Sequence, residues 1–269
     1  MLDKAVILAR GLGTRMQQAD ASAELTPEQA AAADAGVKAM IPIGRPFLDY
    51  VLTALADAGY RRACLVVAPE HDEVREYYAG VSSRRIAVEF AVQVEPNGTS
   101  DAVAAAEGFA AGEPFLAINS DNYYAVAALR AMRRDVTGSA LAAFTRSGLL
   151  RGNIPPERIA TYAIVQADEA GRLVRIVEKP TDADMAAAGE PVRVSMNCWR
   201  FEPSIFDGCR AIGPSARGEW ELPDAVRYAM EHLGVTFQTV TIDEPVLDLS
   251  HRSDIAAVKR ELANVEVDL

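Results

Sequence analysis

The chain has 269 residues, half of them apolar, and a formal net charge of −11. This acidic balance argues against nucleic-acid binding, because phosphate backbones attract clusters of Lys and Arg. It does not exclude a small anionic ligand, which needs only a local positive pocket. No apolar stretch approaches the roughly 20 residues that span a membrane, and the three cysteines lack C-x-x-C spacing. We therefore expect a cytoplasmic protein without nucleic-acid or membrane partners.

The first predicted element is a strand over residues 5–9, an apolar run typical of a strand buried on both faces of a parallel sheet. Residues 17–37 are rich in Ala and Gln and predict either a mobile flap or an amphipathic helix over the site. Within them, Thr26 is a candidate N-cap, Pro27 suits the first helical turn, and Gly36 can end the helix.

Strands and helices alternate through the rest of the first half. The predicted helices cover residues 47–58, 72–78 and 100–110, and the predicted strands cover residues 63–67, 86–92 and 115–118. The second half predicts a hairpin of residues 160–166 and 173–178, a strand over 197–201, and helices over 203–212, 222–233 and 251–263. This alternation indicates a doubly wound α/β sheet. The absence of an internal repeat or a long linker favours one domain.

A glycine-rich turn follows the first predicted strand. Gly11 and Gly13 bring bare backbone N–H groups close to a ligand, which suits phosphate oxygens, and Arg15 adds a planar cation able to bind two of them. The spacing is not the dinucleotide fingerprint, because Met16 stands at the third glycine position, and it is not a P-loop. Taken alone, the segment is equally consistent with an ordinary tight turn.

Lys38 places a second cation after the glycine loop, before a predicted short strand and a proline-bounded turn. A lysine here suits a triphosphate, although a surface role is commoner for this residue type. Residues 8–16 and 38–46 together resemble the L-A-x-G-x-G-T-R-[ML] and K-x-x-x-P segments of the sugar-phosphate nucleotidylyltransferases, in that order. The resemblance continues to the C-terminus.

The resemblance implies a Rossmann-like fold and a specific reaction. Residues 1–135 would form a nucleotide-binding half and residues 136–269 a sugar-phosphate-binding half of one domain. The enzyme would transfer a nucleotidyl group from UTP, dTTP or a related NTP to glucose-1-phosphate or a similar sugar-1-phosphate, releasing pyrophosphate. The resemblance also suggests a homo-oligomer.

A third motif lies at residues 93–102 and resembles the family's Q-x-x-P-x-G-T-A-x-A segment, which lies beside the base. The amide of Gln93 has both a donor and an acceptor for the edge of a pyrimidine, and Gly98 would let the backbone approach the base. A Pro/Gly turn before a capped helix explains the same residues structurally. The predicted nucleotide-binding residues are Leu8, Ala9, Gly11, Gly13, Thr14, Gln93, Pro96, Gly98 and Thr99.

Asp121 follows the apolar strand of residues 115–118, and ligands of open α/β sheets lie beyond such strand ends. It matches the metal-binding Asp of the family's L-x-G-D segment. Asp248 would be its partner, in a segment that resembles W-x-D-x-G-T but has lost the Trp, Gly and Thr. Two carboxylates with phosphate oxygens and waters suit Mg²⁺. A turn or helix cap is the alternative role for each carboxylate.

Three residues of the second half complete the predicted site. Glu178 and Lys179 match the family's V-x-E-K-P segment, which implies that Glu178 binds sugar hydroxyls and Lys179 faces the sugar phosphate. Asn197, in a segment similar to N-x-G-x-Y, is the third sugar-phosphate residue. The predicted catalytic residues are Arg15, Lys38 and Asp121.

Two other functions stay open. One is a cytidylyltransferase for a non-sugar phosphate, which Gln93 and the Glu178–Lys179 pair disfavour. The other is a non-catalytic sensor of nucleotide-sugar, which the intact Arg15 and Asp121 argue against. A dehydrogenase fits less well, because the glycine spacing is wrong and no acid ends the strand at residues 63–67.

Overall fold

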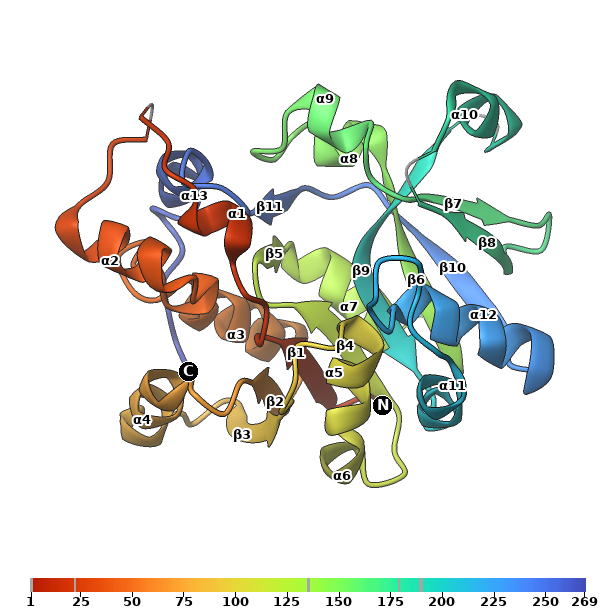
Figure 1. The fold of residues 1–269 in the computed structure, drawn as a ribbon, viewed down its shortest axis with the longest axis horizontal. Coiled ribbons are helices and arrows are strands. Elements are labelled where there is room, and N and C mark those ends of the chain that lie inside the picture. Colours follow the sequence, from red (N-terminus) through yellow and green to blue (C-terminus); the bar gives the residue numbers. More distant parts are fainter. Residues whose placement is uncertain (1, 22, 135, 179, 189–190) are drawn as a thin grey trace.

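A mixed sheet forms the centre of the computed structural model, which describes residues 2–21, 23–134, 136–178, 180–188 and 191–269 (Figure 1). In spatial order its strands are β10 (Phe237–Ile242), β6 (Ser139–Thr145), β9 (Arg193–Phe201), β4 (Phe115–Asn119), β1 (Lys4–Leu8), β2 (Arg62–Val67) and β3 (Ala87–Val92). A hairpin of β7 (Ile164–Ala167) and β8 (Leu173–Val177) joins the sheet through β9. Separately, β5 (Asn122–Tyr124) pairs with β11 (Val246–Asp248).

Strand direction divides the sheet. β1 is parallel to β2 and β4, and β2 is parallel to β3, whereas β9 runs antiparallel to both β4 and β6. Strands from the two halves of the chain therefore share one sheet. The predicted Rossmann-like, mixed α/β fold is confirmed.

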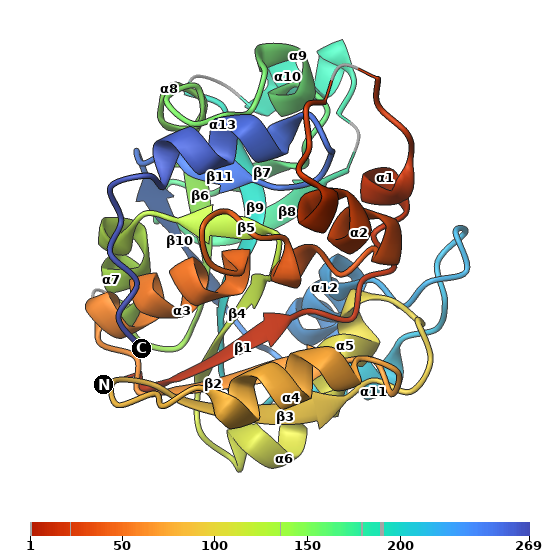
Figure 2. The ribbon, with the colours of Figure 1, turned by 90° about the vertical axis from the view of Figure 1, so that its left-hand side faces the viewer.

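Helices cover both faces of this sheet (Figures 1 and 2). They are α1 (Thr14–Gln17), α2 (Pro27–Ala35), the 3₁₀ turn η1 (Lys38–Met40), α3 (Phe47–Ala58), α4 (Asp72–Gly80), α5 (Thr99–Ala105), α6 (Glu107–Ala110), α7 (Val126–Arg134), α8 (Arg146–Leu149), α9 (Pro156–Ile159), α10 (Asp182–Ala188), α11 (Ile205–Ala211), α12 (Leu222–His232) and α13 (Asp254–Glu261). Among the described residues, no helix has the length and apolar composition to span a membrane.

Two hydrophobic clusters show why β1 is apolar from Ala5 onward. Ala5 and Ile7 belong to one cluster, with α3 and α7, whereas Val6 belongs to the other, with α5, α11 and α12. Successive side chains of a strand point to opposite faces, so a strand covered on both faces needs apolar residues at every position.

The segment before Lys38 forms the helix predicted from its caps. The Thr26 hydroxyl accepts a hydrogen bond from the Gln29 backbone N–H, and the Gln29 side chain accepts one from the Thr26 N–H. Gly36 ends α2 in the left-handed region, with φ 76°. The helix is tied down, because Gln29 Nε2 donates to the Pro42 carbonyl at 2.9 Å and Arg252 pairs with Asp34.

Two local predictions are wrong. The segment after Lys38 forms η1 and an isolated bridge between Pro42 and Pro46 instead of a short strand. The helix expected over residues 100–110 breaks at Ala106 into α5 and α6. The sequence interpretation also missed β6, β10 and α7.

Gly36 is expected to be intolerant of a side chain. Its φ is positive, and a Cβ there would lie 2.6 Å from the Leu12 carbonyl oxygen of the glycine loop. We expect Gly36→Ala to lower the unfolding free energy by about 1–3 kcal/mol, measured by chemical denaturation. Gly80→Ala is the matched control, since a Cβ at Gly80 meets open space. Equal stability of the two variants would contradict this account of the α2 cap.

Candidate functional site

A cavity of about 410 Å³ lies where β1 and β4 end, in the position that ligands take in open α/β sheets. All nine predicted nucleotide-binding residues line it, and so do the three predicted catalytic residues, Arg15, Lys38 and Asp121. We call it the nucleotide cavity. The structure thus brings together side chains separated by more than 100 positions in the sequence.

The glycine loop forms one wall of the nucleotide cavity, and its backbone conformation requires a glycine at position 13. The φ of Gly13 is 63°, and a Cβ there would lie 2.2 Å from the carbonyl oxygen of Gly36. Gly11 has no such neighbour within 4 Å among the described residues, so packing does not explain a glycine there. α1 begins directly after the loop and carries Arg15.

The loop after β3 forms the opposite wall. Gln93 is buried, and its Nε2 donates to the Gly98 carbonyl at 3.0 Å and to the Asp101 carboxylate at 2.9 Å. Both amide hydrogens are therefore used inside the protein. The side-chain oxygen is the atom of Gln93 left to accept a hydrogen bond from a base.

A segment of the second half closes this loop. The Trp220 N–H donates to the Asn97 carbonyl at 2.7 Å, and the Ser100 N–H donates to the Trp220 carbonyl at 2.9 Å. The neighbouring Glu219 lines the nucleotide cavity, a role that the sequence interpretation missed. No local signal could have found it, because its place depends on pairing between residues 120 positions apart.

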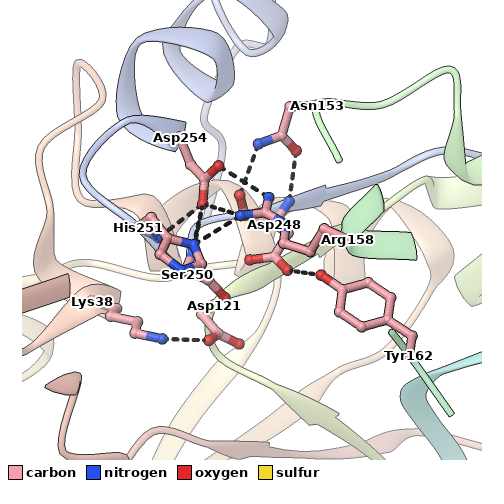
Figure 3. A network of polar contacts seen from close by, with 9 residues as sticks. All are labelled: Lys38, Asp121, Asn153, Arg158, Tyr162, Asp248, Ser250, His251 and Asp254. Carbon is pink, nitrogen blue, oxygen red and sulfur yellow. Dashed lines mark hydrogen bonds and ion pairs between the residues drawn. The ribbon is translucent and has the colours of Figure 1, made fainter. Parts of the chain in front are cut away.

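Asp121 joins the nucleotide cavity to a second, smaller cavity. Its Oδ2 accepts a hydrogen bond from Lys38 Nζ at 2.8 Å, and both side chains are largely buried (Figure 3). The second cavity has about 140 Å³ and is lined by Arg15, Asn119, Asp121, Asn122, Tyr162, Ser195, Met196, Asn197, Asp248 and Ser250.

The β5–β11 pair carries Asp248 to this second cavity. Asp248 lies opposite Asn122 in the register, and the Leu249 N–H donates to the Asp121 carbonyl at 2.8 Å. The side-chain amide of Asn153 forms two hydrogen bonds with the backbone of Asp248. Asn153 Nδ2 donates to the Asp248 carbonyl, and the Asp248 N–H donates to Asn153 Oδ1, each at 2.8 Å (Figure 3). The pairing of β5 with β11 thus brings Asp248 beside the residues that follow Asp121.

The Asp248 carboxylate is buried beside a like charge. Burial raises the pKa of Asp248, and the charge of Asp121 adds to this effect, whereas the Ser250 and Tyr162 hydroxyls and Arg158 partly offset it. Tyr162 donates its hydroxyl hydrogen to Asp248 Oδ2 at 2.7 Å. Asp248 Oδ1 is buried and has no hydrogen-bond partner within the described parts of the chain.

A second layer of polar contacts holds the segment that follows Asp248. Arg158 donates two hydrogen bonds to the Asp254 carboxylate, at 3.1 and 3.0 Å, and lies 2.8 Å from His251 Nδ1. Asp254 in turn accepts from the backbone N–H groups of Ser250 and His251 (Figure 3). These contacts fix the chain on both sides of the small cavity.

Asp121 and Asp248 are the residues best placed to hold a metal. The structure contains no group of three or more His, Cys, Asp or Glu placed for a metal ion within the described ranges. Two carboxylates are nevertheless what Mg²⁺ uses when substrate phosphates and waters supply its other ligands. The unpartnered, buried Oδ1 of Asp248 fits such a ligand.

The three predicted sugar-phosphate residues do not share one cavity. Asn197 lines the small cavity with a φ of 53°, a left-handed conformation that Asn tolerates better than most residues and that is enriched at functional sites. Glu178 lines a third cavity of about 740 Å³ between β8 and α12. Lys179 lies outside the described residues, so its role stays a prediction, as does that of Glu178.

Comparison with known proteins identifies the family. The family described as nucleotidyl transferase matches residues 4–262. The chain belongs to the nucleotidyl transferase family. It is 25% identical to the UTP–glucose-1-phosphate uridylyltransferase AglF of Haloferax volcanii over 93% of both chains. It is 26% identical to a glucose-1-phosphate thymidylyltransferase of Streptomyces griseus, over 96% of this chain and 65% of that one.

A solved structure has the same fold as this nucleotidyltransferase. It is a UDP-glucose pyrophosphorylase complexed with UDP-glucose, with a TM-score of 0.75 over 99% of this chain and 100% of that chain. At 18% sequence identity the likeness supports the architecture of the sheet and its helices.

Removing the charge of Asp248 should stabilise the metal-free protein. We expect Asp248→Asn to raise the Tm in EDTA by about 2–4 °C, equivalent to roughly 1 kcal/mol, because a neutral amide removes the cost of burying the charge and the repulsion with Asp121. Scanning calorimetry measures this shift. Asp49→Asn is the control with the opposite expected sign: Asp49 is equally buried but accepts hydrogen bonds from Arg45, Tyr77 and Tyr78. A lower Tm for Asp248→Asn would show that its charge is well compensated.

Proposed function

We propose that this nucleotidyltransferase transfers a uridylyl or thymidylyl group from UTP or dTTP to a sugar-1-phosphate and releases pyrophosphate. One observation carries the proposal: the nucleotide cavity and the small cavity adjoin at Asp121, and Arg15 lines both. A triphosphate in the first cavity and a phosphate in the second would have their reacting groups close together. Such positioning accounts for most of the catalysis in phosphoryl and nucleotidyl transfer.

The donors and acceptors of Gln93 support the proposed choice of base. With both amide hydrogens donated to Gly98 and Asp101, Gln93 offers an oxygen acceptor. Uracil and thymine carry an N3–H donor at the matching edge, whereas cytosine has an acceptor at N3 and donates only through its 4-amino group. The arrangement therefore supports UTP or dTTP over CTP, and with it the nucleotidyl transfer proposed above over the cytidylyltransferase alternative.

The phosphates meet cations from the first half of the chain. Arg15 and the backbone N–H groups of the glycine loop would hold the leaving pyrophosphate, since a planar guanidinium binds two phosphate oxygens at once. Lys38 would neutralise charge at the α- and β-phosphates. Its ammonium lies 2.8 Å from the carboxylate of Asp121, where the two cavities adjoin. The sugar phosphate is itself an anionic nucleophile, so the reaction needs no general base.

We place a divalent cation, Mg²⁺, at Asp121 and Asp248. When bound, Mg²⁺ would polarise the α-phosphate and reduce repulsion between the two anionic substrates. Tyr162 would keep Oδ2 of Asp248 oriented, leaving Oδ1 free to bind the ion. Residues 1–135 would thus bind the nucleotide, and residues 136–269 would supply Asn197, Glu178, Lys179 and Asp248 to the sugar-phosphate side.

The reaction itself can be tested by pyrophosphate release. A panel of UTP, dTTP, CTP, ATP and GTP is crossed with several sugar-1-phosphates, with Mg²⁺ and then with EDTA. We expect release that requires UTP or dTTP, one class of sugar-1-phosphate and the metal. If no combination releases pyrophosphate and the protein still binds nucleotide-sugar, the result would favour a sensor instead.

Arg15 provides the matching variant. We expect Arg15→Ala to lower kcat by about 10²-fold or more, with an unchanged Tm, because Arg15 is exposed and its loss opens no hole in the core. Arg84→Ala is the control, an exposed arginine outside the three cavities. Wild-type turnover in Arg15→Ala would contradict its place at the phosphates.

A further inference from the structure

Arg10 is a charged residue in the wall of the nucleotide cavity that the mechanism above does not use. It follows β1 in the glycine loop and is only 7% exposed. Arginine stays protonated in proteins, and a buried guanidinium is costly unless polar groups surround it. The hydrogen-bond partners of the Arg10 guanidinium therefore indicate its role.

Those partners are backbone carbonyls of the opposite wall. Arg10 Nε donates to the Gln93 carbonyl at 3.4 Å, and Nη2 donates to the Val94 carbonyl at 3.3 Å. Within the described ranges Arg10 forms no ion pair, and its Nη1 has no hydrogen-bond partner. Its task is thus not to neutralise an acid but to tie the glycine loop to the loop that begins after β3.

The contact reaches the base through Gln93. The backbone of Gln93 is held by Arg10, and its side chain is held by Gly98 and Asp101. The direction of the side-chain oxygen follows from these restraints together. A planar guanidinium holds two successive carbonyls in one fixed orientation, whereas a lysine ammonium can also contact two carbonyls, as Lys4 does with those of Phe109 and Ala110, but restrains their direction less.

We propose that Arg10 is a positioning residue for base selection. It holds the carbonyls of Gln93 and Val94, and in this way aims the Gln93 oxygen at the N3–H of uracil or thymine. The inference rests on the proposed function for the identity of the nucleotide. It adds a residue whose effect is on the choice of base rather than on the sugar phosphate.

Two substitutions of the full chain test the role, by equilibrium binding of UTP, dTTP and CTP with Mg²⁺ and by steady-state kinetics. In Arg10→Met we expect the ratio of affinities for the preferred nucleotide and CTP to fall by about tenfold. The KM for the NTP should rise, while the KM for the sugar-1-phosphate changes by less than about twofold. Arg10→Lys keeps the charge but not the fork, so we expect the same loss of selectivity.

Arg75→Met is the matched control. Arg75 also donates to two successive carbonyls after a strand, those of Ala68 and Pro69, but it lines none of the three cavities. We expect its selectivity to equal that of the wild type.

The outcomes separate two failures. Unchanged selectivity in Arg10→Met, or full selectivity in Arg10→Lys, would overturn the role of Arg10 alone. If Arg10→Met does not fold, Arg10→Lys decides. Absence of binding of all three nucleotides by the wild-type chain would overturn the proposed function, and the role of Arg10 with it.

Discussion

Repulsion between the carboxylates of Asp121 and Asp248 is the constraint on which the site depends. Like charges repel more strongly when they are shielded from water, and Asp248 is 4% exposed. Lys38 offsets the charge of Asp121, and the Tyr162 hydroxyl stabilises one oxygen of Asp248. The other oxygen of Asp248 keeps no partner within the described residues. The remaining repulsion makes this place attractive to a cation, which is the physical basis of the metal proposed there.

Side-chain contacts hold the chain on both sides of Asp248 in spite of this repulsion. Asn153 holds the backbone of Asp248 on both sides, and the Arg158–Asp254 pair fixes the turn that follows. These contacts join three segments that share no hydrogen-bonded ladder of the main sheet. The site therefore depends on side-chain networks as much as on strands, and each network contains a charged or bidentate contact.

The elements that sequence analysis predicted are those with a local signature. Apolar runs predicted β1 and β2, and the caps Thr26 and Gly36 predicted the ends of α2. The nucleotide motifs also have local causes, such as the left-handed φ at Gly13. By contrast, β11 is three residues long, and the contact of Tyr162 with Asp248 joins positions 86 residues apart. Nothing within one segment marks such pairs, since tertiary packing decides them.

Gly98 shows how the structure changes an interpretation drawn from the sequence. The motif suggested that a glycine there lets the backbone approach the base. In the structure its φ is 118°, and a Cβ would lie 2.6 Å from the carbonyl oxygen of Trp220. The glycine is thus required by contact with the second half of the chain. Since Arg10 holds the start of the same loop and Trp220 holds its end, the loop proposed to bind the base is restrained from both sides. The second half of the chain therefore contacts the loop to which we assign the choice of base.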